Sequence, residues 1–143
     1  MSYQLIESDA QLRDLLARVL PAQAVAVDTE FMRRNTFYPH PGLYQLCFSS
    51  EPQTAWLVDP LRVTDFTPLR ELFSDLQCVK VLHSASEDLE VFQHFLGVQP
   101  QPYFDTQKAA AFTGHGFGLG YGALVLSIIG QEICKDETRS DWL

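Results

Sequence analysis

The sequence predicts one α/β domain in which helices cover a sheet. Short β-branched apolar runs alternate along the chain with segments whose apolar residues recur every three or four positions, the pattern of alternating strands and helices. The length of 143 residues fits one domain, and a composition that is 46% hydrophobic and 20% charged is that of a globular protein.

The first elements are a strand, a helix and a second strand. Residues 3–7 favour a strand, and Ser8 is suited to cap an amphipathic helix over residues 9–20, in which leucine and valine recur at helical spacing. Residues 24–27 are apolar throughout and β-branched at two positions, so we expect a central strand that is buried on both faces.

A loop and a hairpin follow. Charged residues, aromatic residues and two prolines mark residues 32–41 as a loop. Residues 42–48 and 54–58 are two β-rich runs joined by a short polar segment, which predicts an antiparallel hairpin. Thr67, followed by a proline, is suited to cap the next helix.

Residues 78–82 predict another strand, which leads directly into a helix. The helix start has the S-x-x-E sequence of a capping box. In such a box, the Ser84 side chain accepts a hydrogen bond from a backbone N–H of the first turn, and the Glu87 side chain accepts one from the Ser84 N–H. Gly97 ends this helix.

Two helices separated by glycines are predicted in the last third. Asp105 and Thr106 offer a cap for a helix through residues 108–112, and the apolar residues 123–129 predict a buried helix. Residues 114–122 hold five glycines, but they follow a helix and lack the GK[ST] ending of a phosphate-binding loop, so we interpret them as a flexible turn.

Composition excludes several kinds of protein. Ten Lys and Arg against eighteen Asp and Glu give a net charge of −8, which argues against nucleic-acid binding through a general basic surface. Cys47, Cys78 and Cys134 show no CxxC spacing, which favours small core residues over a disulfide framework or a zinc site. We expect a cytoplasmic protein with no membrane partner, since no apolar run approaches bilayer length and the N-terminus does not resemble a signal peptide.

Asp28 and Glu30 are the first candidate site residues. They lie two positions apart on the expected strand of residues 24–27 and its continuation, so both side chains point to one face and repel each other when ionised. A proton, an arginine or a divalent cation such as Mg²⁺ or Mn²⁺ would relieve the repulsion. The structural alternative is that Glu30 turns into solvent.

A second acidic cluster, Glu87, Asp88 and Glu90, opens the helix after the strand of residues 78–82. Helical spacing turns Asp88 toward the sheet and Glu90 outward, so Asp88 is the member available for chemistry. Strand ends and the following helix starts gather at one rim of an α/β sheet, which predicts that Asp88 lies near the first pair. His83 is suited either to bind a phosphate or to serve as an internally hydrogen-bonded structural residue.

These residues resemble the exonuclease motifs of the ribonuclease D family, within the DEDD exonuclease superfamily. V-D-T-E-F (residues 27–31) is similar to the first motif, and H-S-A-S-E-D-L-E-V-F (residues 83–92) is similar to the second. Further similarity covers essentially the whole chain, through G-L-Y-Q-L, D-P-L, Q-P-Y-F-D-T-Q and K-D-E-T-R-S-D-W-L, which begin at residues 42, 59, 101 and 135.

The resemblance implies a ribonuclease H-like mixed sheet flanked by helices and a 3′–5′ exoribonuclease that shortens RNA 3′ ends, tRNA precursors in particular. It implies two divalent ions, Mg²⁺ or Mn²⁺, in a complete site. Asp28, Glu30 and Asp88 would be the catalytic metal ligands, and the residues expected to contact substrate are Thr29, Phe31, His83 and Ser84.

The sequence departs from the family in one respect. The third motif, a tyrosine followed four residues later by an aspartate, does not occur after Asp88, since Tyr121 is followed by Val125 at that spacing. We therefore expect residues 1–143 to be the N-terminal part of the exonuclease domain, C-terminally incomplete, without the downstream helical domains and with little activity.

Two other interpretations stay open. One is a non-catalytic module of the same fold that binds RNA or protein, and the other is a DNA-directed 3′–5′ proofreading exonuclease, which shares the first two motifs.

Overall fold

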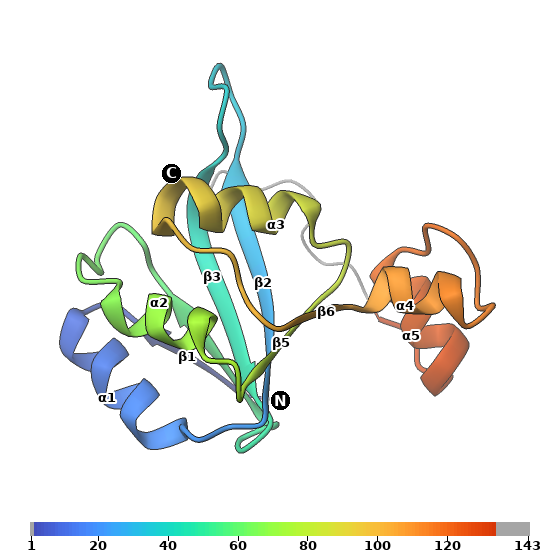
Figure 1. The fold of residues 1–143 in the computed structure, drawn as a ribbon, viewed down its shortest axis with the longest axis horizontal. Coiled ribbons are helices and arrows are strands. Elements are labelled where there is room, and N and C mark those ends of the chain that lie inside the picture. Colours follow the sequence, from blue (N-terminus) through green and yellow to red (C-terminus); the bar gives the residue numbers. More distant parts are fainter. Residues whose placement is uncertain (1, 134–143) are drawn as a thin grey trace.

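The computed structural model describes residues 2–133 and contains one six-stranded sheet in the order β1-β4-β3-β2-β5-β6. Figure 1 shows helices in front of the sheet and a separate group of helices beyond one of its edges. No helix among residues 2–133 is both long and apolar enough to cross a membrane.

The elements follow the order strand, helix, three strands, helix, strand, helix, strand, two helices. Their bounds are β1 Ser2–Ile6, α1 Asp9–Val19, β2 Ala24–Met32, β3 His40–Phe48, β4 Thr54–Val58, α2 Thr67–Ser74, β5 Val79–Leu82, α3 Ser86–Val91 with a π-helical continuation Phe92–Leu96, β6 Tyr103–Asp105, α4 Thr106–Phe112 and α5 Tyr121–Ile129.

The sheet is mixed, as the sequence predicts. β2 pairs with β3 and β3 with β4 in antiparallel register, which confirms the hairpin, whereas β1 with β4, β2 with β5, and β5 with β6 are parallel. The sequence analysis missed β6 because its three residues carry no alternation by which to recognise a strand.

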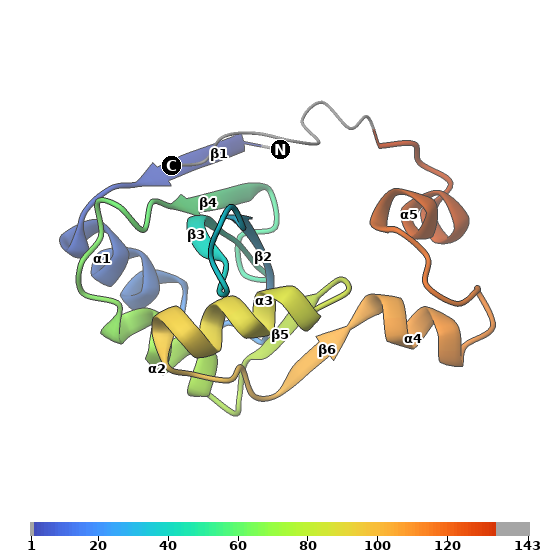
Figure 2. The same ribbon diagram turned by 90° about the horizontal axis from the view of Figure 1, so that it is seen from above.

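One face of the sheet carries the hydrophobic core. Helices α1, α2 and α3 all lie against this face, as the view from above shows (Figure 2). Val25 and Val27 of β2 point into the core, but Ala26 between them is exposed. The expectation that β2 is buried on both faces is therefore wrong for the described residues, because helices cover only one face there.

A carboxylate from β6 does the capping that the sequence assigns to Ser84. Asp105 accepts hydrogen bonds from the backbone N–H groups of Ser84 and Ala85, each at 3.1 Å, and from Gln107 and Lys108 at the start of α4, at 2.9 and 3.3 Å. The predicted capping box is wrong, since α3 begins only at Ser86 with no side-chain cap and Ser84 has a left-handed φ of 58°. Asp105 does cap α4, as predicted.

Two other expectations at helix ends need correction. α2 begins at Thr67 with Phe66 in the cap position, so Thr67 lies inside the helix rather than before it. α5 is largely exposed, with Leu124 its one buried residue, because it lies beyond the sheet edge and away from the core. The glycine-rich residues between α4 and α5 form a connecting turn, as predicted.

Lys80 is a fully buried lysine in the middle of β5. Its Nζ donates to the backbone carbonyls of Asp75, Cys78 and Gln101 at 2.6, 2.7 and 2.9 Å, so all three donors of the ammonium group are used. Desolvation lowers its pKa. The lysine ties the chain before β5 to the chain before β6.

The substitution Asp105→Ala tests whether this carboxylate holds the two turns together. Four backbone N–H groups lose their acceptor, so we expect the free energy of unfolding to fall by about 2–4 kcal/mol. Urea denaturation measures the change. Asp75→Ala is the matched control, because Asp75 accepts a single N–H, from Gln77, at an exposed turn; an equal effect of the two substitutions would contradict the linking role of Asp105.

Candidate active site

Asp28 and Glu30 lie on one face of β2, and a glutamine of the neighbouring strand connects them. Gln45 of β3 is directly opposite Asp28, and its Nε2 donates to Asp28 Oδ2 at 3.2 Å and to Glu30 Oε1 at 3.3 Å. One amide group therefore holds both carboxylates near each other. The sequence analysis did not select Gln45, although a polar residue in an otherwise apolar strand was a usable signal.

Asp88 reaches β2 from α3 and is only 6% exposed. Its Oδ1 accepts hydrogen bonds from the backbone N–H of Thr29 at 3.1 Å and from the Thr29 hydroxyl at 2.5 Å. The pairing of β5 with β2 ends at Ala26 and Val81, so β2 continues beyond β5 and exposes a free edge there. Asp88 occupies that edge, and Thr29 directs it to a position beside the Asp28–Glu30 pair.

All three carboxylates have raised pKa values. Burial, together with the nearby Asp28 charge, raises the pKa of Asp88 to about 6 despite the hydrogen bonds from Thr29. Desolvation raises the pKa of Asp28, although that residue keeps an exposed surface, and desolvation followed by repulsion from Asp28 raises the pKa of Glu30. The site therefore concentrates negative charge where water solvates it poorly.

The donor set has the chemistry that a hard divalent cation requires. Glu30 and Asp88 each lie close enough to Asp28 for its charge to raise their pKa values, and none of the three carboxylates forms an ion pair with a lysine or arginine in the described residues. Hydrogen bonds from Thr29 and Gln45 hold these side chains in place. Within residues 2–133, no three or more His, Cys, Asp or Glu side chains are close enough together to hold a metal ion as they stand. The oxygen donors fit Mg²⁺ or Mn²⁺, and cation binding requires the carboxylates to turn toward a common point.

His83 and Ser84 lie at the end of β5, on the α4 side. The His83 ring nitrogens contact Thr106 Oγ1 at 2.8 Å and the Leu119 carbonyl oxygen at 2.9 Å, so His83 has the internally hydrogen-bonded role that was its structural alternative. Ser84 is exposed, and its backbone N–H is bound to Asp105.

Thr29 and Phe31 lie on the face of β2 opposite to Asp28. Thr29 is buried and its hydroxyl is turned to Asp88, whereas Phe31 is half-buried and packs against the core. Next to them, Arg33 forms an ion pair with Glu90, which confirms that Glu90 points outward on α3.

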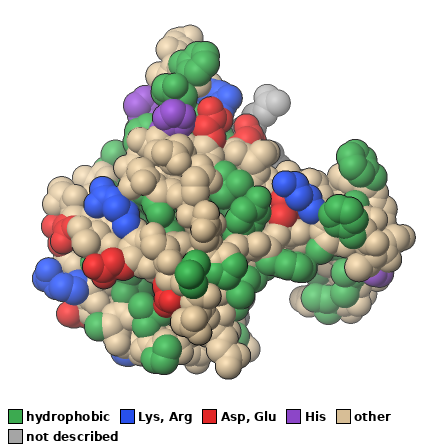
Figure 3. Space-filling model, in the orientation of Figure 1, with side chains coloured by type: hydrophobic (Ala, Val, Ile, Leu, Met, Phe, Trp, Pro, Cys, Tyr) green, Lys and Arg blue, Asp and Glu red, His purple; other side chains and the backbone are tan. Residues whose placement is uncertain are grey.

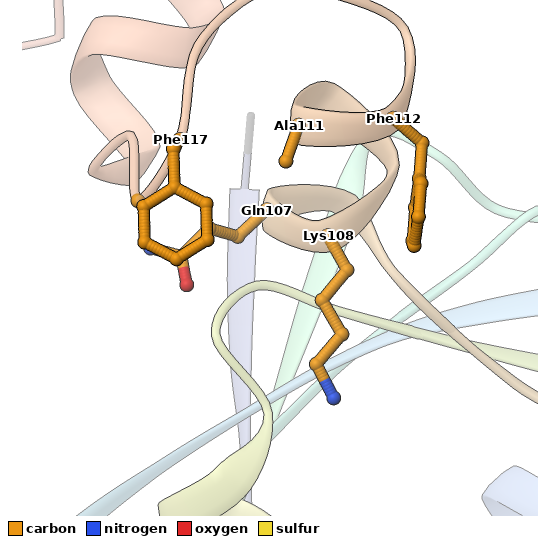
Figure 4. A pocket seen from close by; sticks show the side chains of 6 residues that line it. Gln107, Lys108, Ala111, Phe112 and Phe117 are labelled. Atoms are coloured by element: carbon orange, nitrogen blue, oxygen red, sulfur yellow. The ribbon is translucent and has the colours of Figure 1, made fainter.

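A separate cavity of about 470 Å³ lies on the outer side of α4 (Figure 4). Its lining residues include no carboxylate and are Gln107, Lys108, Ala111, Phe112, Phe117 and Gly118. It does not contain any residue of the carboxylate site.

Comparisons with known proteins agree with the motifs. The family model described as 3′–5′ exonuclease matches residues 3–143. The chain is 47% identical over 140 residues to ribonuclease D of Pseudomonas paraeruginosa and 44% identical over 143 residues to ribonuclease D of Escherichia coli, covering 98% and 100% of this chain. It spans 36% and 37% of the length of those relatives.

Solved structures agree as well. The crystal structure of Escherichia coli RNase D, described as an exoribonuclease involved in structured RNA processing, superposes with a TM-score of 0.93 at 42% identity, over 99% of this chain and 37% of that one. Trypanosoma brucei RNase D in complex with RNA U12 superposes with a TM-score of 0.81 at 22% identity, over 92% of this chain and 48% of that one, and shows the shared fold. The resemblance to ribonuclease D is thus confirmed, and the chain belongs to the 3′–5′ exonuclease family.

Proposed function

We propose that this chain carries the first two motifs of a 3′–5′ exoribonuclease of ribonuclease D type. The observation that carries the proposal is that Glu30 and Asp88 both lie near Asp28, with raised pKa values for all three carboxylates and no basic partner in the described residues. A poorly solvated cluster of like charges costs folding free energy unless a ligand of opposite charge binds there.

The cofactor in this proposal is a pair of Mg²⁺ or Mn²⁺ ions held by Asp28, Glu30 and Asp88. When bound, such ions activate a water molecule and stabilise the leaving 3′ oxygen of a phosphodiester. Thr29 keeps Asp88 at the site through its two hydrogen bonds, and Gln45 keeps Asp28 and Glu30 together. These two residues are positioning residues in the proposal.

Four further residues complete the proposed site. The backbone of Thr29 lies beside Asp88, where we propose that it contacts a terminal nucleotide. Phe31 is half-buried against the core, and in the proposal the exposed part of its ring contacts the same nucleotide. In the proposal, the hydrogen bonds of His83 and Ser84 hold the turn between β5 and α3. This turn sets the position of α3, the helix that carries Asp88.

The proposed substrate is the 3′ end of RNA, with tRNA precursors as the finer proposal, in the cytoplasm. The identity to ribonuclease D relatives supports RNA over DNA. We propose residues 1–143 as the N-terminal part of an exonuclease domain, and we expect weak activity from these residues alone because no Tyr-x-x-x-Asp follows Asp88.

The substitution Asp28→Asn tests the metal site. Losing one anionic ligand weakens Mn²⁺ binding about tenfold or more, as measured by titration calorimetry, and abolishes any metal-dependent trimming of a 3′-labelled single-stranded RNA. Asp14→Asn, at an exposed position of α1, is the control and leaves both unchanged. Mn²⁺ binding that is equally strong in wild type and Asp28→Asn would refute the assignment, and metal binding without trimming would support an incomplete catalytic site.

The raised pKa of Asp88 predicts a pH effect on stability in the metal-free protein. Because the folded pKa is about 6 and the ordinary value is 3.8, the folded state binds more protons in this interval, and this carboxyl makes the protein less stable as pH rises through it. Asp88→Asn removes the penalty. In EDTA, the variant therefore gains about 2–3 kcal/mol relative to wild type between pH 4 and pH 7, measured by urea unfolding. A difference between the two proteins that does not change with pH would contradict the shift.

A further inference from the structure

The loop between β2 and β3 forms a projecting tip with cationic and aromatic side chains. Figure 1 shows this hairpin extending past α3, well beyond the rest of the sheet. We call its residues the tip surface, together with one histidine of the adjacent helix; they are Arg34, Phe37, Tyr38, His40 and His94. Neither the carboxylate site nor the core uses these side chains.

The hairpin is held in place by the helix that carries Asp88. The Tyr38 ring packs at a tilt on the His94 ring, with their centroids 3.5 Å apart, and the centroids of the His40 and Phe95 rings are 5.3 Å apart. Arg33 at the base of the tip forms the ion pair with Glu90. These contacts join the hairpin to α3 and its continuation, so the tip surface and Asp88 belong to one packed unit.

The outer part of the tip has no such packing. Phe37 is 83% exposed and touches Tyr38 edge-on at 4.9 Å, while Tyr38 is 43% exposed. Arg34, unlike its neighbour Arg33, has no ion pair among residues 2–133. The same loop therefore offers an exposed ring face at Phe37 and a positive charge at Arg34, three residues earlier in the chain.

This combination favours a nucleic-acid strand over a protein partner. Successive bases stack on aromatic side chains while basic side chains follow the phosphates, and both features are present at the tip. The chain as a whole carries a net charge of −8, and Arg34 places at the tip a positive charge that no acidic side chain of the described residues pairs. Figure 3 shows histidine, basic and hydrophobic side chains gathered at this end of the molecule, next to acidic ones.

The position of the tip surface relative to the carboxylates also favours a nucleic-acid strand. β2 continues from Asp28 and Glu30 to Met32, with a β-bulge between Glu30 and Phe31, and then leads into the tip, so at about 3.3 Å per residue Arg34 lies at most about 13 Å from Glu30. A single strand with its 3′ end at the carboxylates passes the tip within a few nucleotides if it leaves along β2.

We propose that the tip surface binds single-stranded RNA a few nucleotides before the 3′ end, with a base stacked on Phe37 and a backbone phosphate at Arg34. The inference rests on the proposed function and names where its substrate is held. It explains how an acidic chain retains a polyanion without a general basic surface.

Fluorescence anisotropy with a 5′-labelled oligouridylate of about ten nucleotides, in EDTA, tests the tip without cleavage and without the metal site. Phe37→Ala weakens binding about tenfold, and Phe37→Trp restores it because the stacking face is kept. Arg34→Ala weakens binding and lowers the slope of log affinity against log salt by about one. The matched control is Phe117→Ala, at a 97% exposed phenylalanine of the α4–α5 turn, which leaves binding unchanged.

Two results would overturn the inference. One is a wild-type chain that does not bind the oligonucleotide, and the other is a Phe37→Ala variant that binds it as tightly as wild type, as expected if the tip contacts a protein instead. Both are distinguishable from failure of the proposed function, which is judged by Mn²⁺ binding and its loss in Asp28→Asn.

Discussion

The Asp105 carboxylate is the constraint on which the arrangement around the site depends. It accepts hydrogen bonds from four backbone N–H groups, two in the turn after β5 and two at the start of α4. Burial alone would raise its pKa, but these hydrogen bonds outweigh burial and leave the pKa below its usual value. Asp105 therefore stays ionised and sets the direction in which α3 leaves β5.

Asp88 shows what the same residue type does in the opposite environment. It has one hydrogen-bonding partner residue, Thr29, and a nearby carboxylate, Asp28, and its pKa is raised to about 6. Backbone N–H groups stabilise the charge of Asp105, whereas burial and repulsion destabilise the charge of Asp88. This contrast separates a structural aspartate, at the end of β6, from one suited to bind a cation, on α3.

The predictions that succeeded rest on local patterns, and those that failed needed a distant partner. The β-rich composition of residues 42–48 and 54–58 and the short polar segment between them predict the hairpin, and helical spacing turns Asp88 toward the sheet. The S-x-x-E sequence at Ser84 satisfies the local rule for a capping box, yet Asp105, 21 residues away, supplies a charged acceptor that binds the Ser84 and Ala85 N–H groups. A charge-assisted hydrogen bond of this kind is stronger than one to a neutral hydroxyl.

The sequence alone determines the α/β class, most of the strands and helices and the chemistry of the site, because period, turn residues and residue type are local properties. It also carries the motifs by which the family is recognised. Only the tertiary structure decides that Gln45 joins Asp28 to Glu30, that Thr29 holds Asp88 and that the tip packs on the α3 continuation. These contacts join residues far apart in the chain, and strand register and the packing of α3 on the sheet bring them together.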